Sequence, residues 1–147
     1  MKINLIVVGK LKEKFLVDGV AEYLKRLKKF ARLEICEVPE CRTVEAEGQK
    51  ILSLVPKDSW FCVLDVSGIA LTSEDFAKKI SALNLEGVSN LTFAIGGAFG
   101  LSEELRRAAS FRLSLSQMTF THQMARLILV EQIYRAFKIN RNEPYHW

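Results

Sequence analysis

The chain has 147 residues, of which 49% are hydrophobic and 26% are charged, and its formal net charge is +4. No apolar run reaches the roughly 18 residues that a membrane-spanning helix needs. The first ten residues, MKINLIVVGK, have too short an apolar stretch for a signal peptide and no small-residue cleavage site. We therefore expect one cytoplasmic domain over residues 1–147, without membrane contact.

The charge is unevenly distributed along the chain. Residues 1–32 carry a net charge of +6, residues 33–120 a net charge of −4, and residues 121–147 a net charge of +2. Basic ends around an acidic middle are compatible with a nucleic-acid-binding face built from the first helix and the C-terminal region. A solvated lysine face without a partner is the alternative.

The cysteines and histidines do not indicate a metal site. Three cysteines occur without a CxxC pair, and the two histidines are too few to complete a zinc site. Cys36 and Cys62 fall in strand-like runs, and we expect both to be small core residues.

The first half of the chain alternates apolar strands with helical periodicity. Lys2–Val8 is rich in strand-forming apolar residues, and apolar residues from Leu16 to Ala31 recur with a helical period. Leu33–Val38 predicts a second strand. Thr43–Leu54 predicts a helix with Thr43 as its cap and with Glu47 and Lys50 paired at helical spacing.

The second half continues the alternation. Trp60–Val66 is a continuous apolar run, interrupted only by Asp65, which indicates a central strand that ends in a turn at Ser67-Gly68. A helix from a Thr72 cap to Leu83 follows. The remaining predicted elements are a strand at 91–95, a helix at 102–109, a strand at 111–116, a polar loop at 117–121 and a helix at 122–138.

Alternating strands and helices predict an α/β domain with a mostly parallel five-stranded sheet and helices on both faces. In such sheets, ligands bind beyond the carboxyl ends of the strands. Three loops that follow strands are candidates to share this edge, namely residues 64–68, 96–100 and 114–121.

The stretch LTFAIGGAFGLSEEL, residues 91–105, is the most informative of the three. It reads as a buried strand, a glycine-rich turn and a helix capped by Ser102. Its GGxxG pattern follows the fourth strand, whereas a dinucleotide fingerprint follows the first, and there is no Gly-Lys-Ser/Thr of a P-loop. Glu103 and Glu104 would compete with a phosphate at the helix start, so a cationic or zwitterionic ligand fits better.

The last predicted helix carries an arginine on an apolar face. Arg126 lies opposite Arg135 on the helical wheel, among apolar residues, with His122 one turn before it. A buried arginine needs a partner. That partner is either an intrachain acid, such as Asp65 or Glu131, or a ligand or subunit interface that Arg126 and His122 both face. The helix is apolar all round, which favours a dimer contact.

The chain ends in aromatic and imidazole side chains, Tyr145, His146 and Trp147. These residues predict a tail that docks on the protein, and aromatic side chains near a basic surface can also stack on unpaired bases.

Several segments together resemble a known family. They are IGGAFGLSEEL, LSLSQMTFTHQMARLILVEQIYRAFKI, NEPYH, MKINLIVVGKLKEKF and EYLKRL, which span nearly the whole chain. The chain is similar to the ribosomal RNA large subunit methyltransferase H family, small enzymes of the SPOUT class that use S-adenosylmethionine (AdoMet). The resemblance implies a C-terminal trefoil knot, which ordinary topology rules would exclude. It also implies a homodimer, with methyl transfer from AdoMet to N3 of a pseudouridine in 23S rRNA of the large subunit or assembled ribosome.

The resemblance also implies site residues. The cofactor-binding positions are Leu64, Gly96, Leu115, Ser116, Gln117, Met118, Thr119 and Phe120. The candidate catalytic residues are His122, Arg126, Tyr145 and His146, and Tyr134 and Arg135 match further family positions. The tail residues are expected to approach the cofactor of the partner chain, and no metal is expected.

The chain departs from the family pattern at three positions. Phe99 stands where relatives often have a polar or acidic residue, Thr121 where proline usually precedes the histidine, and Trp147 where the chain usually ends in Lys or Arg.

The sequence leaves two other functions open. One is a ribosome-associated α/β protein that binds RNA without catalysis, and the other is an enzyme that uses a different nucleotide.

Overall fold

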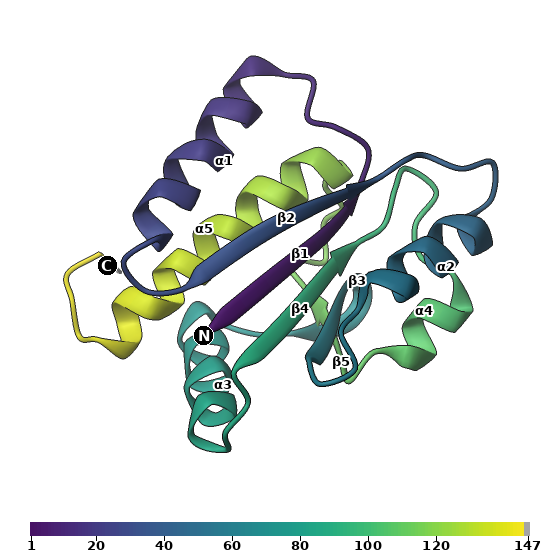
Figure 1. The fold of residues 1–147 in the computed structure, drawn as a ribbon. Helices are drawn as coiled ribbons and strands as arrows, with labels where there is room; N and C mark the ends of the chain where they lie inside the picture. The colour runs from purple at the N-terminus through teal and green to yellow at the C-terminus, as the bar shows by residue number, and fades with distance from the viewer. Residues whose placement is uncertain (146–147) are drawn as a thin grey trace.

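The structure, a computed structural model, describes residues 1–145, which form a single parallel sheet flanked by helices (Figure 1). Its strand order is β2-β1-β4-β3-β5, and every pairing is parallel. The strands are β1 (Lys2–Val8), β2 (Arg32–Val38), β3 (Trp60–Ala70), β4 (Asn90–Ile95) and β5 (Phe111–Ser114). The predicted α/β class is confirmed, and the sheet of the described residues is parallel throughout rather than mostly parallel.

Helices cover both faces of this sheet, as predicted. One face carries α1 (Lys14–Leu27), α3 (Ser73–Leu85) and α5 (His122–Asn140), and the other carries α2 (Val44–Leu54) and α4 (Glu103–Ala108) (Figure 1). The inner strand β1 contributes buried side chains to the helix layers on both faces of the sheet. Ile3 and Leu5 pack with the first group of helices and Ile6 with the second, and all three are at most 1% exposed.

Each predicted helix cap that the structure describes is present. A threonine or serine hydroxyl accepts a hydrogen bond from a backbone N–H three residues later at the start of α2, α3, α4 and α5. The predicted capping residues are Thr43, Thr72 and Ser102, and Thr121, which caps α5, was not predicted.

Helix α1 ends at Leu27, four residues before the predicted end at Ala31. The amides of Phe30 and Ala31 both donate to the carbonyl of Leu27, which turns the chain directly into β2. Phe30 leaves the helical path and packs against the rings of Tyr134 and Phe137 on α5. Tertiary packing, which periodicity does not report, therefore shortens this helix.

Strand β3 continues through the predicted turn at Ser67-Gly68 to Ala70, so the predicted turn is wrong. Leu64 and Ile69 both pair with Leu113 of β5, and the residues between them form a bulge. A Cβ atom at Gly68 would lie 2.5 Å from the carbonyl oxygen of Arg112, so this bulge can form only with glycine at that position. Asp65 and Val66 lie within this bulge.

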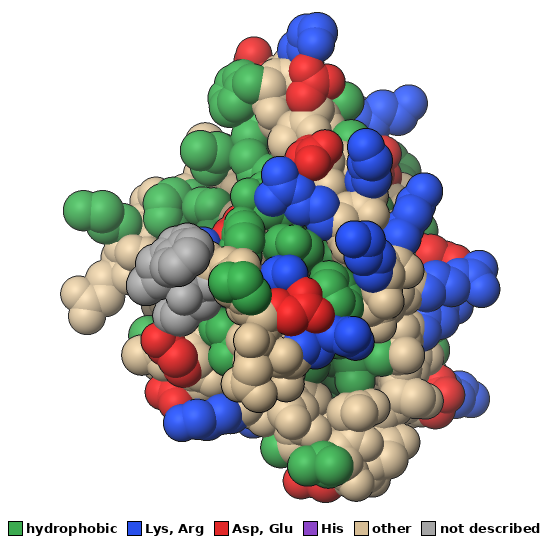
Figure 2. Space-filling view, turned by 90° about the vertical axis from the view of Figure 1, so that its left-hand side faces the viewer, with side chains coloured by type: hydrophobic (Ala, Val, Ile, Leu, Met, Phe, Trp, Pro, Cys, Tyr) green, Lys and Arg blue, Asp and Glu red, His purple; other side chains and the backbone are tan. Residues whose placement is uncertain are grey.

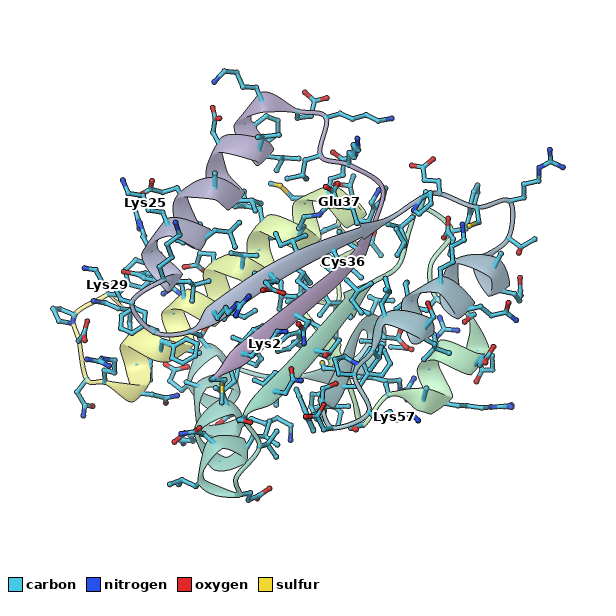
Figure 3. All side chains as sticks on the ribbon, viewed as in Figure 1. Lys2, Lys25, Lys29, Cys36, Glu37 and Lys57 are labelled. Atoms are coloured by element: carbon cyan, nitrogen blue, oxygen red, sulfur yellow. The ribbon has the colours of Figure 1, made fainter. Side chains whose placement is uncertain are left out.

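Two side-chain predictions are also wrong. Cys36 is exposed, because it lies on the edge strand β2 (Figure 3), whereas Cys62 is buried as expected. Glu47 does not pair with Lys50; it faces the protein interior and accepts a hydrogen bond from the backbone of Cys41. The trefoil knot implied by the resemblance stays a prediction.

Candidate active site

Residues of all three segments predicted to share an edge line one cavity of about 910 Å³, although the first segment is the bulge of β3 and only the other two are loops, beyond the carboxyl ends of β4 and β5. The starts of α1 and α5 complete its wall. Of the expected cofactor-binding residues, the cavity is lined by Leu64, Gly96, Leu115, Ser116, Met118, Thr119 and Phe120. Gln117 belongs to the same loop but is not part of the lining. Sequence reasoning missed the contribution of α1, because Glu13 and Phe15 carry no ligand-binding signal of their own.

The glycine turn forms a tight wall of this cavity. The amide of Gly100 donates to the carbonyl of Gly97 at 3.1 Å, and Gly100 has φ +88°, a conformation that side chains disfavour. A Cβ atom at Gly96 would lie 2.5 Å from the carbonyl oxygen of Gly100. Backbone therefore lines this part of the cavity, and a ligand can approach it closely.

The loop that follows β5 forms the facing wall. The Ser114 hydroxyl donates to the carbonyl of Ser116 at 3.0 Å, and the Ser116 hydroxyl accepts from the amide of Met118 at 3.0 Å. These short-range bonds shape the loop without filling the cavity. Met118 and Phe120 remain exposed at its mouth, as does Phe99 at the tip of the glycine turn.

Asp65 is a buried acid on the cavity wall that holds two basic residues. Its side chain is 3% exposed and accepts from Arg106 at 3.0 Å and from Arg112 at 3.2 Å. The Ser67 hydroxyl and amide donate to its other oxygen. Burial raises the pKa of the Asp65 carboxyl, but the hydrogen bonds from Ser67 and Arg106 outweigh it, so that the pKa lies below its ordinary value. Asp65 thus ties the β3 bulge to α4 and β5.

His122, the first residue of α5, lies on the cavity wall. Arg126, one turn later, does not. It is 2% exposed, its guanidinium donates to the carbonyl of Gly9 at 3.0 Å, and it lies 3.5 Å from a carboxylate oxygen of Glu37. Figure 3 shows Glu37 at the end of β2, beside the first turns of α5.

The intrachain partner of Arg126 is therefore Glu37, and the two suggested partners are wrong. Asp65 binds Arg106 and Arg112, and Glu131 binds Arg135 on its own helix. Burial lowers the pKa of the Arg126 guanidinium, and the charge of Glu37 partly opposes this effect. The contact brings together residues 37 and 126, and no sequence pattern indicates a pairing over such a separation.

Tyr145 packs against α5 near Glu131 and Tyr134, about two to three turns beyond His122, and does not line the cavity. Its hydroxyl donates to Glu131 at 3.0 Å and lies 3.2 Å from the hydroxyl of Tyr23, and its ring packs edge-on against Tyr134. Burial, followed by these hydrogen bonds, raises the pKa of the Tyr145 phenol. The tail therefore docks as predicted, up to this residue. His146 and Trp147 lie outside the described residues.

Within residues 1–145, one chain thus brings only His122 of the candidate catalytic residues to the cavity. No group of three His, Cys, Asp or Glu side chains in this part of the chain could hold a metal ion. Nor does any helix among the described residues have both the length and the apolar character needed to cross a membrane.

Comparison with known proteins gives a consistent result over the whole chain. The family model described as "Predicted SPOUT methyltransferase" matches residues 1–146. Proteins named ribosomal RNA large subunit methyltransferase H from Carboxydothermus hydrogenoformans and Halothermothrix orenii are 50% and 49% identical, and each comparison covers 99% of both chains. The corresponding protein of Enterococcus faecalis is 46% identical over the same share.

A solved structure shares the fold at much lower sequence identity. It is that of a probable methylase family protein from Haemophilus influenzae, with a TM-score of 0.55 and 13% identity over 95% of this chain. The chain spans 66% of that protein's length.

Proposed function

Because the chain belongs to the SPOUT methyltransferase family, we propose that it transfers a methyl group from AdoMet to N3 of a pseudouridine in 23S ribosomal RNA. The observation that carries this proposal is the cavity of about 910 Å³ bounded by the glycine turn and the 115–121 loop. The volume is sufficient for a nucleoside with an amino-acid side arm. Relatives that are 46–50% identical carry the name of this rRNA methyltransferase.

The residues around the cavity fit AdoMet better than a nucleotide with phosphates. Apolar side chains such as Leu64, Leu113 and Leu115 can hold the adenine, and the backbone of the glycine turn can approach the ligand. The acids Glu103 and Glu104 occupy the first turn of α4, where a phosphate would otherwise bind. When bound, AdoMet would supply an electrophilic methyl group.

In this proposal the protein positions the methyl donor and accepts the proton that the acceptor nitrogen loses. The cavity walls hold the donor so that the methyl group faces the acceptor nitrogen, which is a large part of the catalytic effect in such a reaction. N3 must lose its proton, and His122 is the described imidazole on the cavity wall. Arg126, held by Glu37 and Gly9, positions the start of α5 that carries His122.

We propose a homodimer in which the partner's tail completes the site. In one chain, Tyr145 is docked on Glu131 and Tyr23 and does not line the cavity, so we assign the role of His146 to the tail of a second chain. Large hydrophobic side chains remain exposed around the starts of α1 and α5, a surface that a partner can cover: Phe15, Val17, Met118, Phe120 and Met124. Figure 2 shows the neighbouring face, where hydrophobic side chains gather beside Lys and Arg side chains.

Transfer of a tritium-labelled methyl group tests the activity. Ribosomes that lack large-subunit methylations are incubated with the protein and labelled AdoMet, and the labelled nucleotide is then mapped. We expect one label, on N3 of a pseudouridine in 23S rRNA. Binding of rRNA without transfer would instead favour a non-catalytic RNA-binding protein, and a label on another nucleotide would overturn the assignment of the acceptor.

A chain-mixing experiment tests the dimer. A variant with His146→Ala and a variant with Gly96→Ala are mixed and allowed to exchange subunits. If the tail serves the partner's cavity, mixed dimers contain one intact site and regain activity. If mixing restores nothing although sedimentation shows exchanged dimers, the tail does not act across the interface.

A further inference from the structure

Glu47 on α2 is a buried carboxylate that is only half satisfied. It is 4% exposed, and its Oε2 atom accepts a hydrogen bond from the amide of Cys41 at 3.0 Å. Its Oε1 atom has no hydrogen-bond partner among residues 1–145. Because an unpartnered buried oxygen lowers the stability of the folded protein, Glu47 is a candidate for a functional role.

The unpartnered oxygen lies against the glycine turn of the cavity. A Cβ atom built on Gly97 would lie 3.0 Å from Oε1 of Glu47 and 3.1 Å from Cγ1 of Val8. Gly97 itself lines the cavity, whereas Glu47 does not. The backbone of Gly97 therefore separates the carboxylate from the ligand space, and the absence of a side chain there lets the two approach closely.

The charge of Glu47 is not offset by a neighbouring cation. No Lys, Arg or His side chain within the described residues forms an ion pair with it, whereas Asp65 on the same cavity has both Arg106 and Arg112. Buried charge is weakly screened, so its field extends into adjacent space more strongly than that of a surface acid. The side of the cavity at the glycine turn is therefore biased toward positive ligands.

We propose that Glu47 is a positioning residue whose charge makes the cavity prefer a sulfonium ligand over the corresponding uncharged thioether. This inference rests on the proposed function. AdoMet and the product S-adenosylhomocysteine share the same nucleoside and amino-acid parts, and they differ in one methyl group and one positive charge on sulfur. A negative charge behind the turn attracts the sulfonium of the donor, whereas the uncharged sulfur of the product gains no such attraction.

Calorimetric titration of the wild-type protein and of Glu47→Gln with each ligand tests this inference. Gln has nearly the size of Glu and can still accept from the Cys41 amide, but it carries no charge. We expect the Kd for AdoMet to rise about tenfold and the Kd for S-adenosylhomocysteine to stay within about twofold. Glu45→Gln, an exposed acid on the same helix, is the matched control and should change neither value.

The ratio of the two affinities separates an electrostatic role from a structural one. If Glu47→Gln weakens the binding of both ligands equally, Glu47 only supports the turn and the inference is wrong. The inference is also wrong if neither affinity changes. Glu47→Asp keeps the charge, so it should preserve the wild-type ratio of the two Kd values even if both affinities fall. A changed ratio in this variant would contradict the inference. If the wild-type protein binds neither ligand, the proposed function fails and this inference with it.

Discussion

Gly96 is the residue at which the smallest change should remove ligand binding. A Cβ atom there would lie 2.5 Å from the carbonyl oxygen of Gly100, so Gly96→Ala must open the turn. We expect at least a tenfold loss of AdoMet affinity in calorimetry. Gly87→Ala is the control, because Gly87 has φ +88°, but an added Cβ atom would meet no neighbour within 4 Å and the residue does not line the cavity. It should lower stability and leave affinity unchanged.

Asp65 predicts a pH-dependent contribution to stability. Its pKa is lowered in the folded protein, so the stabilisation is present above the unfolded-state pKa of about 3.9 and is lost as the pH falls through the lower folded-state pKa. We expect Asp65→Asn to cost about 2 kcal/mol at pH 7. In urea unfolding, the difference between variant and wild type should shrink below about pH 4. A difference that stays constant across this range would show that charge is not its source.

Single residues were predictable where the chemistry is local. The caps Thr43 and Ser102 follow from neighbouring sequence, since each bonds an amide three residues later, and the glycine turn follows from its own composition. The partner of Arg126 was not predictable, since Glu37 lies on a distant strand. Cys36 was misassigned because a strand-like pattern does not say whether the strand lies at the edge of a sheet.

At the scale of elements, the start of α5 is fastened to the ends of β1 and β2 by Arg126 and Glu37. Glu37→Gln would leave the guanidinium buried without its countercharge, while Arg126→Met would remove the charge that needs one. Because the Glu37 side chain is 40% exposed, we expect Glu37→Gln to cost only about 1 kcal/mol.

The double variant provides the control for this prediction. In Arg126→Met with Glu37→Gln, no charge remains unpaired, so it should be more stable than the sum of the two single effects implies. Chemical denaturation of the four proteins measures this coupling. Additive effects would mean that the two residues do not act as a pair.

The existence and type of the elements followed from periodicity, but several boundaries did not, and two of these have an evident cause. Strand β3 extends beyond its apolar run because β5 pairs with it on both sides of the bulge. Helix α1 ends early because Phe30 packs on α5. In both cases the deciding contact comes from an element more than 40 residues away in the sequence, which a local window does not include.

At the scale of the whole molecule, the basic face predicted from the charge distribution is assembled from both ends of the chain. A second cavity of about 370 Å³ lies between α1 with its following turn and the C-terminal region, and two acids and two aromatic residues line it together with five cations. The cations are Lys25, Arg26, Lys29, Lys138 and Arg141. Figure 3 shows Lys25 on the outer side of α1 and Lys29 in the turn that follows this helix.

Replacing Lys25 and Lys29 by Glu should weaken rRNA recognition selectively. We expect the KM for ribosomes to rise about tenfold and its salt dependence to decrease, because fewer phosphates are neutralised. AdoMet affinity should not change, since neither lysine lines the first cavity. Lys57→Glu, on the connection before β3, is the control for Lys25→Glu alone, since each of these single variants changes the charge by −2. An equal effect of that variant would indicate net charge rather than a defined face.

The architecture class was predictable because alternating elements favour a parallel sheet, but the strand order β2-β1-β4-β3-β5 was not. Many orders satisfy the same alternation. The convergence of three segments on one cavity was predictable in general form, because the carboxyl ends of parallel strands meet at one edge. The contribution of α1 depends on how that helix returns over the sheet, which only tertiary structure determines.

The strand order has a consequence for how this protein is made. On one side β1 pairs with β2, which follows it closely, but its other neighbour, β4, begins only at Asn90. A growing chain therefore leaves one edge of this largely buried strand uncovered through most of its synthesis, which is the condition that exposes nascent chains to misassembly. The cavity walls include residues up to Ala125. A translation product that ends before Ala125 lacks part of this wall, and we expect it not to bind the proposed methyl donor.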